Sequence, residues 1–164
     1  MSAIISDCGR YRYRLERIGP GEGSTAIIMV NPSTADAEQD DHTIRKLRGF
    51  GERHNWGRLI VGNLFAYRAT DVRELGRVDD PIGRPENWHY LNGMLGEADR
   101  IIVAWGPVAK QPRHLRDTWR DIPHLARQWG KGLLCIGSPA KCGHPKHPLM
   151  LSYELPILNW SAPQ

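Results

Sequence analysis

The sequence predicts an α/β fold, a three-layer α/β/α sandwich around a central four-stranded parallel sheet. Four short apolar runs are rich in β-branched residues, and a loop and a stretch of helical periodicity follow most of them. Each run is continuously apolar, which is typical of strands that are covered on both faces in a parallel sheet. The four expected strands are residues 26–30, 59–63, 101–105 and 133–136.

Helical patterns separate these strands. Apolar residues recur at helical spacing in residues 41–54, 86–98 and 113–129, and the last of these is the longest amphipathic segment. Before the first central strand, residues 11–18 alternate enough to predict an edge strand or hairpin. Residues 149–160 close the chain without a clear helix. Strands therefore alternate with helices along the whole chain.

Length and composition indicate a single domain over residues 1–164. No apolar run approaches the roughly 18 residues that cross a bilayer, and the first residues do not have the pattern of a secretion signal. We therefore expect a cytoplasmic monomer. The chain has three cysteines without a CxxC pair, which indicates free thiols. Its net charge of +4 weakly favours polyanionic partners.

The first unusual segment is Asn31-Pro32-Ser33-Thr34, directly after the first central strand. In open α/β sheets, ligands bind outside the carboxyl ends of the strands. Pro32 has a fixed φ and favours an extended Asn31, so the Asn31 amide would be held rigidly at the strand tip. An ordinary turn is the alternative interpretation. The acidic stretch that begins at Asp36 caps and solvates the next helix, with a metal site as its alternative.

Polar and aromatic residues also follow the second and third strands. Asn63 ends the second strand, and its amide both donates and accepts hydrogen bonds, as reading the edge of a pyrimidine requires. A structural asparagine is equally compatible with this position. Phe65 and Tyr67 are candidates to stack on a ring, or they belong to the core. Gly106, next to Trp105, allows close approach of the backbone, and a packing turn is the alternative.

Two His-Pro pairs, which begin at His144 and His147, follow the last central strand. Together with Cys142 they suggest zinc, but their spacing fits no standard structural site and a fourth ligand is missing. A histidine held beside a proline is better suited to donate a hydrogen bond to developing negative charge. We therefore expect no metal and no other cofactor.

Taken in order, these segments resemble the uracil-DNA glycosylase superfamily over about residues 26–151. Asn31-Pro32-Ser33 looks like the motif that positions the attacking water, and Asn63 like the asparagine that reads the base. VAWGPVAK is similar to a Trp-Gly-x-x-Ala stretch, and GHPKHPLML to the His-Pro motif that stabilises the departing base. The resemblance implies a fold like that of the glycosylases.

The chain also resembles, more closely, a bacterial and phage family known only as a domain of unknown function. The shared pattern is NPSTAD, NLFAYRAT, DPIG and GHPxHPL. The chain departs from the glycosylase pattern in three respects. The aromatic residue after the first motif is missing, no serine follows the His-Pro motif, and the His-Pro pair is duplicated. Of the two histidines, His147 fits better because Pro148-Leu149 follows it.

The resemblance implies a monofunctional DNA glycosylase that leaves an abasic site. Asn31 would orient the water, and Asp36, Asp40 or Asp41 would assist it. By this resemblance, Ser33 corresponds to a position that carries a tyrosine in the strict uracil enzymes. That tyrosine blocks substituents at carbon 5 of the base. The implied substrate is therefore a 5-substituted pyrimidine, such as a glycosylated hydroxymethyl base in phage DNA, and the implied role is antiviral defence.

Two other functions are compatible with the same residues. One is a hydrolase or binder of a free modified nucleotide, and the other is a DNA-binding module that has lost catalysis. A structural domain whose motifs are only turns is the third alternative. The predicted catalytic residues are Asn31, His147 and Asp36. The predicted base-binding residues are Pro32, Ser33, Asn63, Phe65 and Tyr67. The predicted DNA contacts are Thr34, Arg68, Gly106, Lys110, His144 and Lys146.

Overall fold

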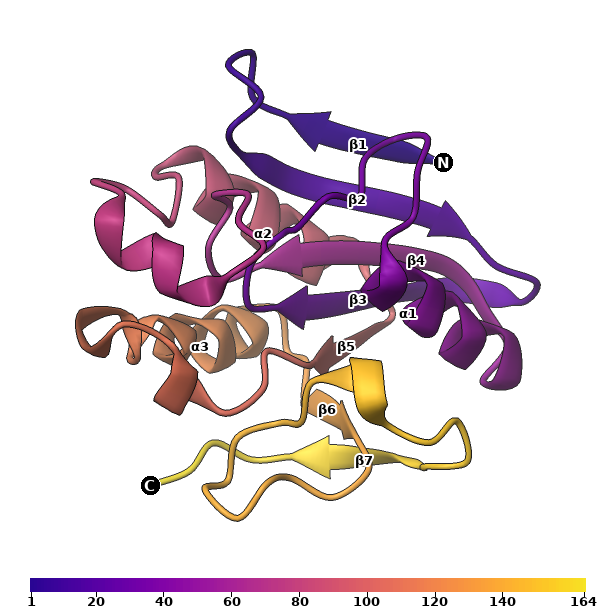
Figure 1. Ribbon diagram of the computed structural model, residues 1–164. Helices are drawn as coiled ribbons and strands as arrows, with labels where there is room; N and C mark the ends of the chain where they lie inside the picture. Colours follow the sequence, from indigo (N-terminus) through magenta and orange to yellow (C-terminus); the bar gives the residue numbers. More distant parts are fainter.

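The computed structural model describes all 164 residues and contains a mixed seven-stranded sheet with helices on both faces (Figure 1). The α/β class is therefore confirmed. The strands are β1 (Ser2–Ile5), β2 (Arg12–Ile18), β3 (Glu22–Met29), β4 (Trp56–Asn63), β5 (Arg100–Val103), β6 (Leu133–Ile136) and β7 (Ile157–Trp160). The helices are α1 (His42–Arg53), α2 (Glu86–Glu97) and α3 (Asp121–Gln128).

The strands are arranged in the order β1-β2-β4-β3-β5-β6-β7. β3 pairs in parallel with β4 and with β5, and β5 pairs in parallel with β6. β1 and β2 form an antiparallel hairpin at one edge, so the edge strand or hairpin predicted over residues 11–18 is confirmed. β7 adds an antiparallel strand at the other edge, where the sequence pattern predicts only an irregular end.

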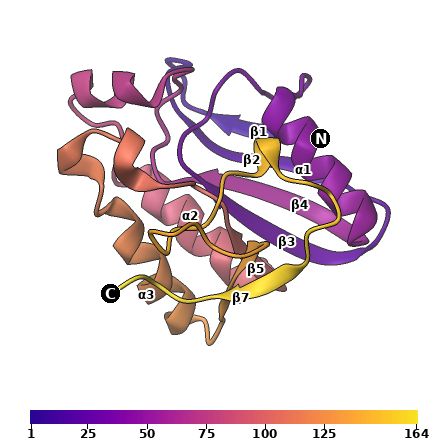
Figure 2. The ribbon, with the colours of Figure 1, turned by 60° about the horizontal axis from the view of Figure 1, so that its bottom comes forward.

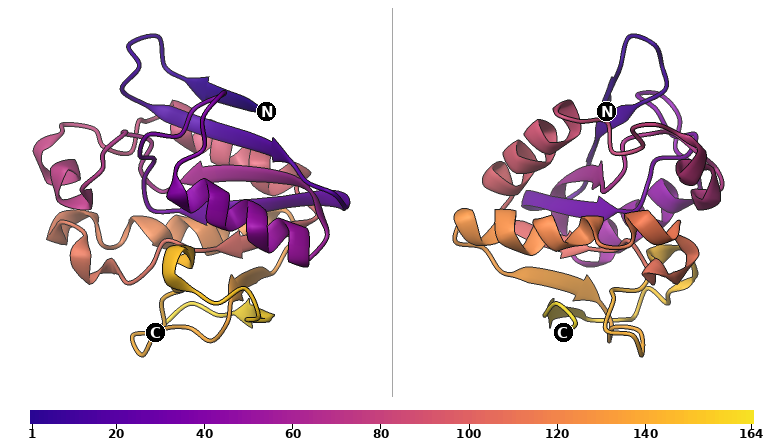
Figure 3. Two further views of the ribbon diagram at one scale, coloured as in Figure 1. Left: turned by 45° about the vertical axis from the view of Figure 1, so that its right-hand side comes forward. Right: turned by 90° about the vertical axis from the view of Figure 1, so that its left-hand side faces the viewer.

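The sheet separates two hydrophobic cores, which explains the continuous apolar runs. In β3, Ala26 and Ile28 belong to the core beneath α2 and α3, whereas Ile27 and Met29 belong to the core beneath α1. All four side chains are buried. Figures 2 and 3 show α1 on one side of the sheet and α2 and α3 on the other. A strand with both faces buried needs apolar residues at every position.

The segment predicted as one helix over residues 113–129 is instead two 3-10 turns followed by a short α-helix. The turns are η3 (Arg113–Leu115) and η4 (Thr118–Arg120), and α3 begins only at Asp121. Pro123 explains this start because proline lacks an N–H group and is accommodated only in the first turn of a helix. No helix in the structure is long and apolar enough to cross a bilayer.

Two buried arginines of β2 hold the loop that leads from β3 to α1. Arg12 donates from Nη1 to the carbonyl oxygen of Ala35 at 2.8 Å. Arg17 donates from Nε to Oδ1 of Asp40 and from Nη2 to the carbonyl oxygen of Asp36, both at 2.6 Å. Both arginines are at most 2% exposed. The loop that carries the first sequence motif is thus tied to the edge of the sheet.

Replacing Asp40 with alanine should destabilise the protein by about 3 kcal/mol, because it leaves the Arg17 guanidinium buried without its carboxylate. Arg48 pairs with the other oxygen of Asp40, but its side chain is 45% exposed whereas that of Arg17 is 1% exposed. Arg48→Ala should therefore cost less than about 1 kcal/mol. Urea unfolding of both variants checks the prediction, and equal losses of stability would contradict it.

Candidate functional site

A pocket lies where the order of the parallel strands reverses. From β3 the chain continues to β4 on one side, and β5 then pairs with the other side of β3. In open α/β sheets this switch point is the usual place for a ligand. Here it holds a pocket of about 230 Å³, called the switch-point pocket below. Its wall consists of Val30, Val72, Trp105, Gly106, Pro107, Lys110, Gln111 and His147.

Gly106 brings the end of β5 close to the His-Pro loop. Its φ is +78°, a left-handed conformation that favours glycine. A Cβ atom at this position would lie 3.3 Å from the Cβ atom of His147. A side chain on residue 106 would therefore strain the backbone and displace His147. Gly106 thus permits the His-Pro loop to lie close to the end of β5, and its contact with DNA stays a prediction.

His147 is held in one orientation on the wall of the pocket. Its Nδ1 atom accepts a hydrogen bond from the backbone N–H of Leu149 at 3.3 Å, which starts the turn η5 (Pro148–Met150). The neutral ring therefore carries its proton on Nε2. Burial lowers the pKa of His147, Lys110 lowers it further, and Asp41 opposes both effects. At neutral pH, His147 is a neutral donor through Nε2.

His144 has a different environment and belongs to an aromatic cluster. Only 7% of it is exposed, and its Nδ1 atom accepts a hydrogen bond from Nε1 of Trp105 at 3.4 Å. The Trp119 ring meets it edge to face, with centroids 5.1 Å apart. The predicted DNA contact at His144 is therefore wrong for this structure, because the ring supports the back of Trp105. Cys142, His144 and His147 form no cluster of metal-ligating side chains.

Backbone contacts hold the loop after β3. Asn31 donates from Nδ2 to the carbonyl oxygen of Ala69 at 2.7 Å, and the N–H of Ala69 donates to the carbonyl oxygen of Pro32 at 2.9 Å. Arg68 reaches the carbonyl oxygens of Ser33 and Thr34 at 3.4 and 3.3 Å. Arg68 therefore stabilises this loop as well as offering a positive charge.

A second hollow, of about 470 Å³, begins beside the switch-point pocket. The same three loops supply both: Ser33 follows Val30, Thr70 precedes Val72, and Leu149 follows His147. The residues that line this second hollow are Ser33, Thr34, Asp40, Asp41, His42, Thr43, Arg45, Thr70 and Leu149. Small hydroxyl groups and carboxylates thus extend the candidate site beyond the switch-point pocket.

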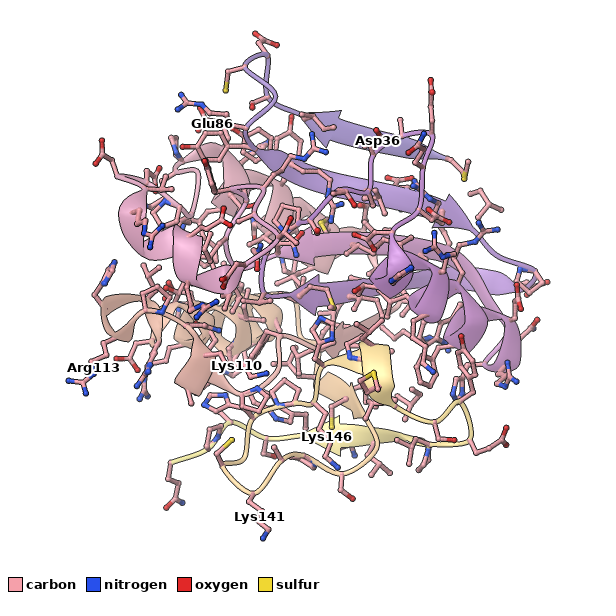
Figure 4. The ribbon with its side chains drawn as sticks, in the orientation of Figure 1. Asp36, Glu86, Lys110, Arg113, Lys141 and Lys146 are labelled. Atoms are coloured by element: carbon pink, nitrogen blue, oxygen red, sulfur yellow. The ribbon has the colours of Figure 1, made fainter.

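Asp36 lines neither hollow, and its catalytic role stays a prediction. Its Oδ1 atom accepts hydrogen bonds from the N–H groups of Glu38 and Gln39, both at 2.9 Å, and these bonds lower its pKa. Figure 4 shows Asp36 next to the edge of the sheet formed by β1 and β2, well apart from Lys110. Asp41 lines the second hollow, as Asp40 does, and it also raises the pKa of His147.

Three predicted base-binding residues lie at or just after the end of β4, and their side chains contact other parts of the protein. Phe65 is fully buried in the core beneath α2, so it offers no face to a base and its prediction is wrong. Asn63 is 1% exposed, and its Oδ1 atom accepts a hydrogen bond from Nη2 of Arg12 at 3.3 Å. Tyr67 is half-buried, and its ring meets that of Tyr11 edge to face. None of the three lines either hollow.

A third, basic hollow of about 450 Å³ shares Lys110 and Gln111 with the switch-point pocket. It lies between the turn η1 (Val72–Arg77) and the segment after η2 (Val108–Lys110). Its lining residues are Arg73, Gly76, Arg77, Ala109, Lys110, Gln111, Pro112, Arg113, His114 and Arg116, without any carboxylate. Figure 4 shows Lys110 and Arg113 on this part of the molecule.

The basic hollow contains most of the site residues that the sequence pattern did not single out. Arg77 and Gln111 carry no motif, and only the cluster of basic residues in KQPRHLR hinted at this hollow. Arg73 forms an ion pair with Asp71 at 2.6 Å, whereas Arg77 and Arg113 form none. Lys146 lines none of the three hollows. The positive charge nearest the pocket therefore comes from Lys110 and η1.

Residues 12–149 match the model of a family described as "Protein of unknown function (DUF1643)". The chain belongs to this family. The range that matches DUF1643 begins at Arg12 and ends at Leu149, so it includes both loop-holding arginines and all three hollows. Searches of curated proteins and of solved structures found no match.

His144 should make stability depend on pH. Burial and then Arg120 lower its pKa in the folded protein, so the unfolded chain binds the proton more readily. Stability should therefore fall as the pH drops below the unfolded value of 6.5. His144→Asn keeps an acceptor for Trp105 but does not titrate. Urea unfolding at about pH 7.5 and 5.5 should show a smaller loss for the variant, and equal losses would contradict the assignment.

Proposed function

We propose that this chain is a monofunctional DNA glycosylase that hydrolyses the N-glycosidic bond of a flipped-out, 5-substituted pyrimidine and leaves an abasic site. One observation carries the proposal. The switch-point pocket combines an apolar wall with His147, whose Nδ1 accepts a backbone hydrogen bond and leaves the proton on Nε2, and it shares two residues with a basic hollow. The apolar wall would contact the flat base, His147 would stabilise the negative charge of the departing base, and the basic hollow would bind the phosphates.

The wall of the pocket is suited to an unstacked ring. Trp105, Val30 and Val72 supply apolar surface, and Gly106 leaves room beside them. Flipping a nucleotide out of the stack costs a few kcal/mol, which such contacts would offset. The basic hollow next to it would hold the phosphates on either side of the flipped nucleotide.

His147 is suited to stabilise the departing base. When the bond between C1′ and the ring nitrogen breaks, the electron pair stays with the base, and negative charge develops on the ring. The Nε2–H group would donate a hydrogen bond to that charge, and the base later takes a proton from solvent. The bond from Leu149 to Nδ1 fixes the ring before the reaction begins. A donor already in place costs no reorganisation.

Water attack would use the loop after β3. The bond from Nδ2 of Asn31 to the carbonyl oxygen of Ala69 fixes the amide and leaves Oδ1 as an acceptor for water. The oxygen of this water would bond to C1′, and its proton would pass to Asp41 or to solvent. Asn31 is an amide and therefore positions the water without acting as a strong base. Asp41 takes the part that the sequence pattern assigned to Asp36.

The second hollow supports a substituted base as the substrate. It provides about 470 Å³ beside the pocket, and Ser33 and Thr34 line it with hydroxyl groups. Asp40 and Asp41 line the same hollow and add carboxylate acceptors. Hydroxyls and carboxylates are the partners that sugar hydroxyl groups need. A glycosylated hydroxymethyl-pyrimidine of phage DNA fits this chemistry, which makes antiviral defence the proposed role.

The rival function is hydrolysis or binding of a free modified nucleotide. Arg77 and Arg113 lie in a hollow of limited size, which favours a single phosphate group as much as a strand. Strong competition by free nucleotide, without salt-dependent binding to oligonucleotides, would favour this function.

The test is base release from a panel of DNAs: unmodified, uracil-containing, and phage DNA with glycosylated hydroxymethyl-pyrimidines. Released bases and abasic sites are measured by mass spectrometry. His147→Asn keeps an acceptor for the N–H of Leu149 but removes the Nε2 donor, so the rate should fall at least about 100-fold. His147→Gln restores a donor near that place and should recover part of the loss. His124→Asn, on the exposed face of α3, is the matched control.

Abasic sites confined to one modified DNA, and lost only in His147→Asn, would support the glycosylase. Wild-type protein that is folded and releases no base from any DNA would sink the proposal. Equal activity of the asparagine variant would remove His147 from the mechanism.

Ser33→Tyr should separate bulky from plain substrates. A tyrosine would fill the part of the second hollow next to the pocket, because Ser33 is half-buried on its wall. We expect at least tenfold slower release of a glycosylated base, while release of a small base persists. The comparison uses two oligonucleotides that differ only in that substituent, and an equal effect on both would contradict the assignment.

A further inference from the structure

Gln111 is a buried amide whose side chain has no partner. Only 3% of the residue is exposed, and neither Oε1 nor Nε2 has a hydrogen bond. Its backbone, by contrast, is fully bonded: the N–H donates to the carbonyl oxygen of Val108 at 2.9 Å, and the carbonyl accepts from Nε of Arg116 at 3.0 Å. The residue is therefore held in place while its amide remains free.

Gln111 lies between two parts of the candidate site, and its amide is buried behind their surface. Gln111 lines both the switch-point pocket and the basic hollow. Lys110 is the only other residue that lines both. Arg116 also donates from Nη2 to the carbonyl oxygen of Ala109 at 2.7 Å, which clamps the segment around it. A ligand that enters the pocket with its phosphate in the basic hollow must pass this side chain.

The other buried amides near the site each have at least one hydrogen-bond partner, although Oδ1 of Asn87 is unpaired. Oδ1 of Asn63 accepts from Arg12, and Nδ2 of Asn87 donates to the carbonyl oxygens of Asn63 and Leu64. Gln111 differs because both of its polar atoms are unpaired. Burying unpaired polar atoms destabilises a protein, so such a group in a native fold calls for a partner. The adjoining pocket is the place from which that partner can come.

We propose that Gln111 reads the hydrogen-bonding edge of the ring that enters the switch-point pocket. Its amide offers one acceptor and a two-hydrogen donor side by side, which matches the neighbouring donor and acceptor on the edge of a pyrimidine. Gln111 thus takes the role that the sequence pattern assigned to Asn63. The proposal deepens the glycosylase function and rests on it for the identity of the ring as a DNA base.

The first test is the stability of the free protein. Gln111→Met removes both polar atoms and keeps nearly the same length, so the midpoint of urea unfolding should rise if the amide waits unpaired for a ligand. Gln128→Met, on the exposed end of α3, is the matched control and should leave the midpoint unchanged. A lower midpoint for Gln111→Met would show that the amide supports the fold, and would overturn the proposal.

The second test is binding of single-stranded oligonucleotides by fluorescence anisotropy. The central residue is cytosine, thymine, 5-hydroxymethylcytosine or a tetrahydrofuran abasic analogue. Wild-type protein should bind at least one base about tenfold more tightly than the abasic analogue. Gln111→Met should lose this difference and keep its affinity for the analogue. Arg77→Ala with Arg113→Ala should weaken binding of all four strands alike.

The outcomes separate the two proposals. Base discrimination that survives in Gln111→Met, or its absence in the wild-type protein, overturns the role of Gln111. Discrimination that is lost in Gln111→Met, without base release from any DNA, supports the role of Gln111 and removes the glycosylase. Base release that continues undiminished in Gln111→Met overturns only the role of Gln111.

Discussion

The candidate site depends on two guanidinium groups buried at the edge of the sheet. Arg12 and Arg17 of β2 bind the carbonyl oxygens of Ala35 and Asp36, and Arg17 also pairs with Asp40. Burial lowers the pKa of Arg12 to about 10, so it remains charged at neutral pH. Charged donors hold backbone carbonyls strongly when water is excluded. The antiparallel hairpin, which lies outside the parallel strands, therefore fixes the loop after β3.

A second constraint brings the carboxyl-terminal part of the chain to the same edge. Gly106 permits the His-Pro loop to approach β5, and Trp105 bonds His144 on its other side. The turn η5 packs next to α1, as Figure 3 shows. The site thus joins Val30 and His147, which are more than 100 residues apart in the sequence and line the same pocket. The sheet between these segments fixes the distance from one loop to the other.

The sequence was most informative where one local rule decides the outcome. Continuous hydrophobicity located the central strands, and clustering at strand ends placed His147 and Ser33 beside neighbouring hollows. It was least informative where a hydrogen-bond partner outside the motif sets the direction of a side chain. The side chain of Asn63 accepts a hydrogen bond from Arg12, and that of Asp36 accepts one from the backbone N–H of Glu38. Neither partner is evident from the motif. No sequence motif marks Gln111. Its importance comes from the missing hydrogen-bond partners of its side chain, which only the structure shows.

The duplicated His-Pro motif shows why residue type alone does not assign chemistry. Both rings use Nδ1 as an acceptor, but His144 binds a tryptophan side chain whereas His147 binds the N–H at the start of η5. The first bond belongs to an aromatic cluster, and the second leaves Nε2 free in a residue that lines the switch-point pocket. His144 can therefore position Trp105 while His147 meets the ligand. Gly106 supports this arrangement, because a Cβ atom at its position would lie only 3.3 Å from the Cβ atom of His147.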